Sequence, residues 1–259
     1  MKKWHVLAAL SAIAFLPVLT SACAGRPVTR TEDFADFDRI DVQNAFDVEI
    51  TQSASFSVTI TTSENLQDYL MVSRTGRTLT LKVSPNHLFT DFVLMRKTLK
   101  ARITMPAIRG LLLSGASHGR LAGFESAGDL DVSITGASSL NMDTVEAGNV
   151  ASEIAGASRL TGKFIARDMR IEVSGASVVT LVGSADNVTA TSSGASRLNL
   201  EDFAHKTASF TMSGASEATV DVHDRLDCTL SGASRLFFLN NPKMGQIDVS
   251  GASTIKHKD

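Results

Sequence analysis

The chain has 259 residues, of which 43% are hydrophobic and 20% charged, a globular composition that excludes an intrinsically disordered protein. Its 25 Lys and Arg residues stand against 27 Asp and Glu residues, and without Lys2 and Lys3 the basic count falls to 23 and the net charge to −4. This balance excludes the strongly basic surface by which proteins bind nucleic acid or anionic lipid.

The first 24 residues have the pattern of a secretory signal. Lys2 and Lys3 form a charged start, residues 6–19 are mostly apolar, and small residues follow at 21–24. The apolar stretch is too short to span a bilayer comfortably, and Pro17 interrupts it. We therefore predict that residues 1–24 direct export to the periplasm or outer membrane, most naturally of a Gram-negative bacterium.

Two ways of processing this signal stay open. Cleavage after Ala24 satisfies the small-residue rule through Ala22 and Ala24. Alternatively, residues 19–23 (Leu-Thr-Ser-Ala-Cys) resemble a bacterial lipobox, in which Cys23 becomes the lipidated N-terminus, although Thr20 stands where a Leu is usual. Residues 25–34 are expected to form a tether. Cys228 has no second cysteine to pair with if Cys23 is removed or lipidated, so no disulfide within the mature chain is expected.

Eight copies of Gly-Ala-Ser run through the C-terminal half at intervals of 18 to 21 residues. Their glycines are Gly115, Gly136, Gly156, Gly175, Gly194, Gly214, Gly232 and Gly251. A period this regular indicates one small structural unit stacked on itself. Glycine permits a backbone bend that a side chain would forbid, so these residues are predicted to form the turn of each unit.

On both sides of each glycine, apolar residues alternate with polar ones, which is typical of strands with one buried face. Each unit therefore offers two short strands, and a third short segment, often marked by Phe as at Phe124, Phe164 and Phe203, returns to the next copy. About 19 to 20 residues suit one turn of a parallel β-helix, and eight copies suggest eight turns. The predicted fold is therefore all-β, a solenoid in which neighbouring turns share one core.

Residues 35–110 lack the Gly-Ala-Ser mark but alternate in the same way. We expect them to supply the first strands and the N-terminal cap of the same solenoid. Residues 35–259 would then form a single domain, with the repeats at 111–259. The charged finish at 256–259 (Lys-His-Lys-Asp) is expected to discourage stacking of the C-terminal end on other chains.

The sequence resembles the head GIN domain of auto-transporter adhesins over roughly residues 35–255. The resemblance rests on residues 37–42 (Phe-Asp-Arg-Ile-Asp-Val), 48–52 (Val-Glu-Ile-Thr-Gln) and 103–106 (Ile-Thr-Met-Pro), and most of all on the repeated Ser-Gly-Ala-Ser. It implies a single-stranded, right-handed β-helix and a location in the cell envelope. It carries over no catalytic residue.

Two carboxylates suggest one alternative function. Glu153 and Glu172 stand three residues before the glycine of consecutive copies, so they would lie one turn apart on the outer surface, near Asp131. Such a pair could bind a cation, or it could form the active centre of a polysaccharide-processing enzyme with a β-helix fold. Arg170, two residues before Glu172, is expected to neutralise the patch instead.

Three arginines suggest a second alternative. Arg159, Arg197 and Arg235 stand three residues after the glycine of alternate copies, with Glu217 interrupting the stripe. This face could bind an acidic glycan or a lipid headgroup.

The remaining residues point away from catalysis. The histidines after residue 24 do not stand at metal-ligand spacing, and the repeated serines are better explained by packing at the turns than by nucleophilic catalysis. We expect no cofactor, no metal site and no bound nucleic acid, and contact with a membrane only through a lipid on Cys23. The sequence favours a non-enzymatic envelope protein, an adhesin-like or scaffolding module whose partner is an envelope protein or glycan and which can form oligomers.

Overall fold

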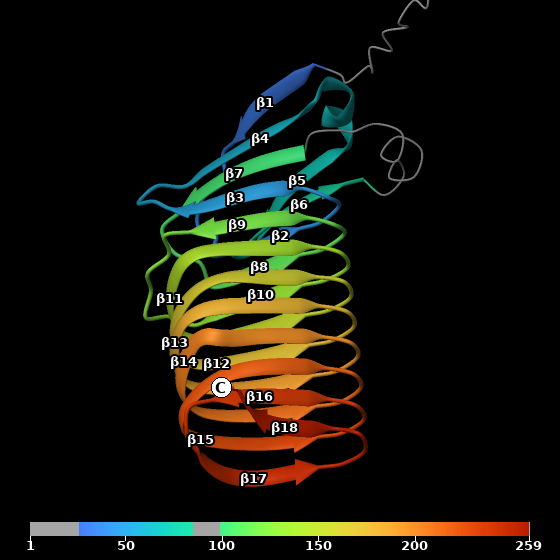
Figure 1. Cartoon of the computed structure of the whole chain (residues 1–259). Helices are drawn as coiled ribbons and strands as arrows, with labels where there is room; N and C mark the ends of the chain where they lie inside the picture. Colours follow the sequence, from blue (N-terminus) through green and yellow to red (C-terminus); the bar gives the residue numbers. More distant parts are fainter. Residues whose placement is uncertain (1–25, 85–98, 259) are drawn as a thin grey trace, which may run out of the picture.

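The structure is a computed structural model that describes residues 26–84 and 99–258, and almost all of its regular elements are β-strands. They coil into a parallel β-solenoid of about seven turns, which confirms the predicted fold (Figure 1). Eight glycine corners bound seven full circuits, so the eight turns suggested by the copy number are one too many. The predicted export signal at 1–24, including Cys23, lies outside the described residues.

Among the described residues, the N-terminal part contains seven strands and one short 3₁₀ helix. They are β1 (Pro27–Glu32), β2 (Arg39–Val42), β3 (Asp47–Gln52), β4 (Ser57–Ser63), η1 (Glu64–Tyr69), β5 (Leu70–Thr75), β6 (Thr78–Val83) and β7 (Leu99–Met105). Strands β2 and β3 pair in parallel with the first strands of the repeat region, whereas β1, β4 and β5 pair antiparallel with their neighbours. No helix among the described residues has the length and hydropathy needed to cross a membrane.

The segment expected to be a tether is in part a strand, and this prediction was wrong for residues 27–32. Strand β1 pairs antiparallel with β4 from Pro27 opposite Ser63 to Glu32 opposite Val58. The physical reason is its run of β-branched residues, Val28, Thr29 and Thr31, behind a proline that occupies the first strand position, where it interrupts no ladder.

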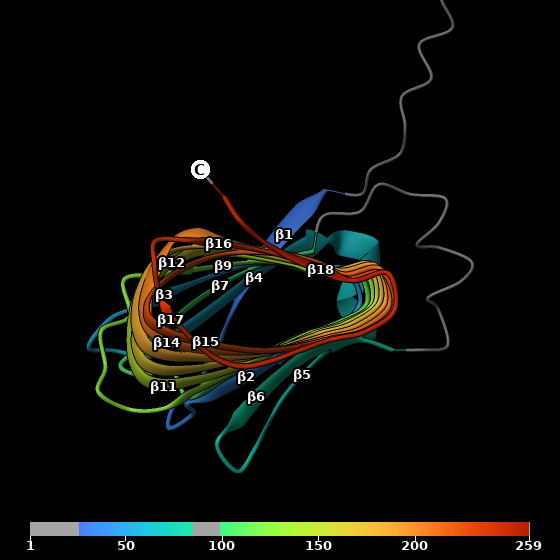
Figure 2. The same cartoon turned by 60° about the horizontal axis from the view of Figure 1, so that its bottom comes forward.

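The repeat region contains eleven of the described strands. They are β8 (Gly110–Leu113), β9 (His118–Ala122), β10 (Leu130–Ile134), β11 (Ser139–Ile154), β12 (Arg159–Val173), β13 (Val178–Ser192), β14 (Arg197–Met212), β15 (Glu217–Leu230), β16 (Arg235–Leu239), β17 (Lys243–Val249) and β18 (Thr254–His257). Each pairs in parallel with the strand one turn away, and the turns superpose when viewed along the solenoid (Figure 2).

The strands β11 to β15 are longer than the sequence predicts. Two short strands and a separate returning segment were expected, but each of these turns is one continuous bent strand of 14 to 16 residues. The pairing continues around the bend, where Phe164 lies between Val145 and Gly183 in register. Because Phe164 and Phe203 are fully buried there, the bend belongs to the same core as the flat segments.

The glycine corners stack directly on one another. All eight glycines have a positive φ, and from Ala157 to Ala252 the amide of the alanine after each glycine donates to the glycine carbonyl one turn earlier, as from Ala176 to Gly156 and from Ala195 to Gly175 (2.8 Å each). The serine that completes each triplet is buried, and at Ser158 and Ser196 its hydroxyl donates to the carbonyl three residues earlier. The serines therefore satisfy the backbone at the corner.

Replacing a corner glycine tests this stacking against a matched control. Gly175 and Gly123 have nearly the same φ (+76° and +73°), but a Cβ at Gly175 would lie closer than 3.0 Å to the carbonyl oxygen of Gly156, whereas a Cβ at Gly123 meets nothing within 4 Å. We expect Gly175→Ala to lower the free energy of unfolding by at least about 3 kcal/mol and Gly123→Ala by only about 1 kcal/mol. Equal losses in a denaturant titration would contradict the role of the close approach.

Among the described residues, one histidine is buried in the core of the solenoid. His205 on β14 is 2% exposed, its Nδ1 donates to the carbonyl oxygen of Phe203 (2.8 Å), and its Nε2 is buried without a hydrogen-bond partner among the described residues. Burial lowers the pKa of His205 below its ordinary value of 6.5, although the bond to Phe203 and the nearby charge of Asp221 act in the opposite direction. The neutral imidazole is therefore the form that the folded protein stabilises.

This burial makes stability depend on pH. The unfolded chain binds a proton at His205 near pH 6.5 and the folded chain only at lower pH, so the contribution is complete above about 6.5 and is lost as the pH falls below it. We expect the wild type to lose up to about 1.4 kcal/mol per pH unit below that value, and His205→Leu to lose less. Denaturant titrations between pH 7.5 and 5.5 check this, and equal slopes in the two proteins would refute it.

Candidate binding face on the outside of the solenoid

The outer surface of one sheet carries the first candidate site. It is built by the strand segments that precede each glycine corner, in β8, β10, β11 and β12, where alternate residues point outward. Parallel pairing places Ser133 opposite Leu112 and Glu153, and Glu153 opposite Glu172. The two carboxylates that the sequence singles out therefore occupy one outward column on consecutive turns.

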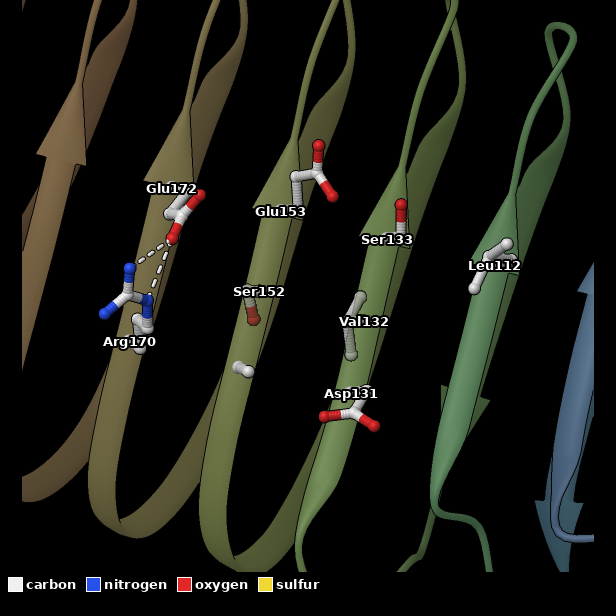
Figure 3. Close-up of a pocket in the computed structure, with 9 residues that line it drawn as sticks. Leu112, Asp131, Val132, Ser133, Ser152, Glu153, Arg170 and Glu172 are labelled. Carbon is white, nitrogen blue, oxygen red and sulfur yellow. Dashed lines mark hydrogen bonds and ion pairs between the residues drawn. The ribbon is translucent and has the colours of Figure 1, made fainter.

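A shallow hollow of about 240 Å³ lies on this surface (Figure 3). Its lining residues are Leu112, Asp131, Val132, Ser133, Ala151, Ser152, Glu153, Arg170 and Glu172. The hollow forms because Ala151, whose side chain is a single methyl group, stands in register between the longer side chains of Asp131 and Arg170. Leu112, which is 46% exposed, adds an apolar patch at one end.

The charges around the hollow are mostly paired. Both Nε and Nη2 of Arg170 donate to Oε1 of Glu172 (2.8 and 2.6 Å), as Figure 3 shows, and Nη2 of Arg39 donates to Asp131 (2.9 Å). Glu153 forms no ion pair within the described part of the chain. The neutralisation of Glu172 by Arg170 follows the sequence-based expectation, and it leaves Glu153 as the carboxylate open to a ligand.

A polar ladder, which was not among the residues predicted from the sequence, borders the hollow. It consists of Asp129, Asn149, Asp168, Asn187 and Thr207. The first four of these residues line a second hollow of about 440 Å³ together with Arg170 and Thr189 on β12 and β13. Every member stands seven residues before the glycine of its copy, so aligning the copies at that position could have found it.

Hydrogen bonds connect this ladder from turn to turn. Asn187 donates to Asp168 (2.7 Å), Thr207 donates to Asn187 (2.6 Å), and Arg167 donates to Asn149 (2.8 Å). The bond from Asn187, followed by that from Arg167, holds the pKa of Asp168 below its usual range. The ladder is consequently an ordered row of amide, hydroxyl and carboxylate groups.

The arginine stripe lies on the other sheet of the solenoid. Arg159, Arg197 and Arg235 begin β12, β14 and β16, and the register runs from Arg159 through Val178 to Arg197 and on through Glu217 to Arg235. Glu217 contacts both neighbours, at 3.5 Å from Arg197 and 2.8 Å from Arg235. Arg159 has no ion pair among the described residues and stands about 10 Å from Arg197, at two turns of about 4.8 Å each.

In the part of the chain that the structure describes, Cys228 and the metal-ligating residue types do not assemble a site. Cys228 is buried on the inner face of β15, and burial raises the pKa of its thiol to about 11, so the reactive thiolate is scarce at neutral pH. In the described ranges, 26–84 and 99–258, no group of three or more His, Cys, Asp and Glu side chains is arranged to hold a metal ion.

Comparison with solved structures gives the same fold in bacterial proteins. A putative lipid binding protein from Parabacteroides distasonis ATCC 8503 has a TM-score of 0.81 at 19% identity, covering 91% of this chain and 98% of that one. A putative adhesin from Parabacteroides merdae ATCC 43184 has a TM-score of 0.78 at 17% identity, covering 91% and 97%. Identities this low establish the fold alone.

A comparison with curated proteins gives no match. The family model described as "Putative auto-transporter adhesin, head GIN domain" matches residues 36–242, which include all the strands from β2 to β16. Because this match spans most of the chain, the protein belongs to the head GIN domain family of that description.

Proposed function

We propose that the protein is an exported, non-enzymatic binding module of the bacterial cell envelope. In this proposal the solenoid acts as an adhesin-like unit that contacts a polar cell-surface glycan through the outer face over β10 to β14. Family membership supports the envelope location. The observation that supports this binding face is the hollow over Ala151 together with the ordered ladder from Asp129 to Thr207.

The chemistry of this face suits a glycan. Carboxylate and amide oxygens accept hydrogen bonds from sugar hydroxyls, while Arg170 and the amide nitrogens donate to them. The groups stand on paired strands at intervals of about 4.8 Å, so a ligand would meet donors and acceptors that are already ordered. The exposed side chain of Leu112 offers an apolar contact beside them.

Two observations favour binding over catalysis at the same residues. Arg170 engages Glu172 through two hydrogen bonds, and both side chains are about half exposed or more (65% and 48%). General acid catalysis by a carboxyl group calls for a site that excludes water, as in clefts of polysaccharide-cleaving enzymes. A polysaccharide-processing activity centred on Glu153 and Glu172 therefore has less support than a contact surface.

The arginine stripe is the second candidate for a binding face. Arg159 is the member without an ion pair among the described residues, and an anionic group of a glycan or lipid could approach it. Arg197 and Arg235 share Glu217, which reduces their attraction for an anion. Because of this pairing, the arginine stripe has less support as a binding face than the hollow.

Binding to purified peptidoglycan and lipopolysaccharide tests the two faces against each other. Ala151→Gln fills the hollow from an outward position and is expected to weaken binding at least about tenfold, or about 1.4 kcal/mol. The matched control, Thr161→Gln, places the same side chain outward on the opposite sheet and should bind like the wild type. If binding is lost only in the variant that combines Arg159→Gln, Arg197→Gln and Arg235→Gln, the arginine stripe is the binding face instead. Release of reducing ends that disappears in Glu153→Gln would overturn the non-enzymatic function.

Cell fractionation of Cys23→Ala tests the anchor separately. If Cys23 carries a lipid, the wild type sediments with membranes and the variant appears in the soluble periplasmic fraction, because a lipidated cysteine is the attachment point. If both proteins fractionate alike, the lipid anchor is wrong and cleavage after Ala24 is the better account of the signal.

A further inference from the structure

The two ends of the solenoid are closed differently. At the N-terminal end, the antiparallel strands β1 and β4 and the helix η1, with its buried Leu66, cover the core. At the C-terminal end, β17 pairs only with β15 and β18 only with β16 among the described residues, which leaves one edge of each strand without a partner (Figure 1). Such an edge presents unpaired N–H and C=O groups to any strand that fits it.

The core is also exposed at this end. Met244, Ile247 and Val249 continue the inward columns of Leu226, Cys228 and Leu230 in register. With no further turn beneath them, Met244 and Val249 remain 41% and 43% exposed, whereas their partners one turn earlier are buried. A solenoid end of this kind needs a cover, because terminal repeats otherwise leave apolar surface in water.

An irregularity in β17 makes this edge complementary to itself. Gly245 and Gln246 together stand opposite the single residue Asp227, so the strand contains a β-bulge. In a regular strand, residues 243 and 248 would face opposite sides. The bulge instead leaves both Lys243 and Asp248 outward, opposite Arg225 and Thr229, and both Met244 and Ile247 inward.

We infer that the C-terminal end of the solenoid is the interface of a homodimer, in which β17 pairs antiparallel with β17 of a second copy of this chain. Centring the two-fold axis between Gly245 and Gln246 places Met244 opposite Ile247 of the partner subunit, with both side chains directed into the joined core. The same register places Lys243 opposite Asp248 of the partner subunit. Each pair occurs twice by symmetry, because a two-fold contact uses the same surface of both copies.

The charged residues after β18 are compatible with this arrangement. Although Lys256, His257 and Lys258 were expected to discourage stacking, Lys258 is held by Glu201 (2.6 Å) and Nε2 of His257 donates to the carbonyl oxygen of Asn240 (3.0 Å). The β17 edge itself has Lys243 and Asp248 as its charges, one of each sign. Because the N-terminal end is covered, it cannot form the same contact. Assembly through the C-terminal end therefore stops at two copies.

The test is the oligomeric state of the exported protein by sedimentation velocity at about 10 µM, where a dimer of this kind is expected to dominate. Lys243→Glu and Asp248→Lys each place two like charges opposite one another across the two-fold axis. Each change is therefore expected to raise the dissociation constant of the dimer at least about tenfold. The variant with both changes restores opposite charges across the axis and should dimerise like the wild type. Lys163→Glu, an exposed change on the side of β12, is the matched control and should leave the dimer intact.

The combined variant also separates loss of the interface from loss of folding, because a misfolded single variant would not be rescued by a second charge change. A wild-type monomer at this concentration would overturn the inference. A dimer that resists both single changes, or one that the combined change fails to restore, would also overturn it by placing the contact elsewhere.

Discussion

The close stacking of the glycine corners is the constraint on which the rest of the structure depends. From Gly136 to Gly232, the carbonyl oxygen of each corner accepts a hydrogen bond from the alanine amide of the next turn at 2.7 to 2.8 Å. This contact leaves no room for a Cβ atom at the following glycine. The contact fixes the spacing of the turns at the corner. The flat strands on either side of the corner therefore pair in the same register from turn to turn.

This register in turn decides what the surface can do. Because like positions of successive copies lie above one another, a residue type that recurs at a fixed distance from glycine becomes a row of side chains. The ladder from Asp129 to Thr207 is such a row, and Ala151 creates a hollow because it interrupts a row of longer side chains. The same holds for the interior. His205 lies in the core because it occupies an inward position in the alternation of inward and outward residues along β14.

The period of the glycines and the alternation around them were sufficient to predict the fold, since both follow directly from local backbone geometry. The column of Glu153 and Glu172 could be predicted for the same reason. The pairing of Arg197 and Arg235 with one carboxylate depends on side-chain conformations, which spacing does not determine. Strand β1 and the bulge in β17 were missed because each depends on a neighbouring strand that the local sequence does not specify.

The interchangeable turns also bear on how such a molecule varies in length. A glycine-to-glycine unit begins and ends at equivalent corners, so a whole unit gained or lost in the middle of the rod leaves the hydrogen bonds of every other corner intact. Each event would alter the rod by about 4.8 Å. Evolution can therefore adjust the reach of this protein in discrete steps while both of its distinct ends are preserved.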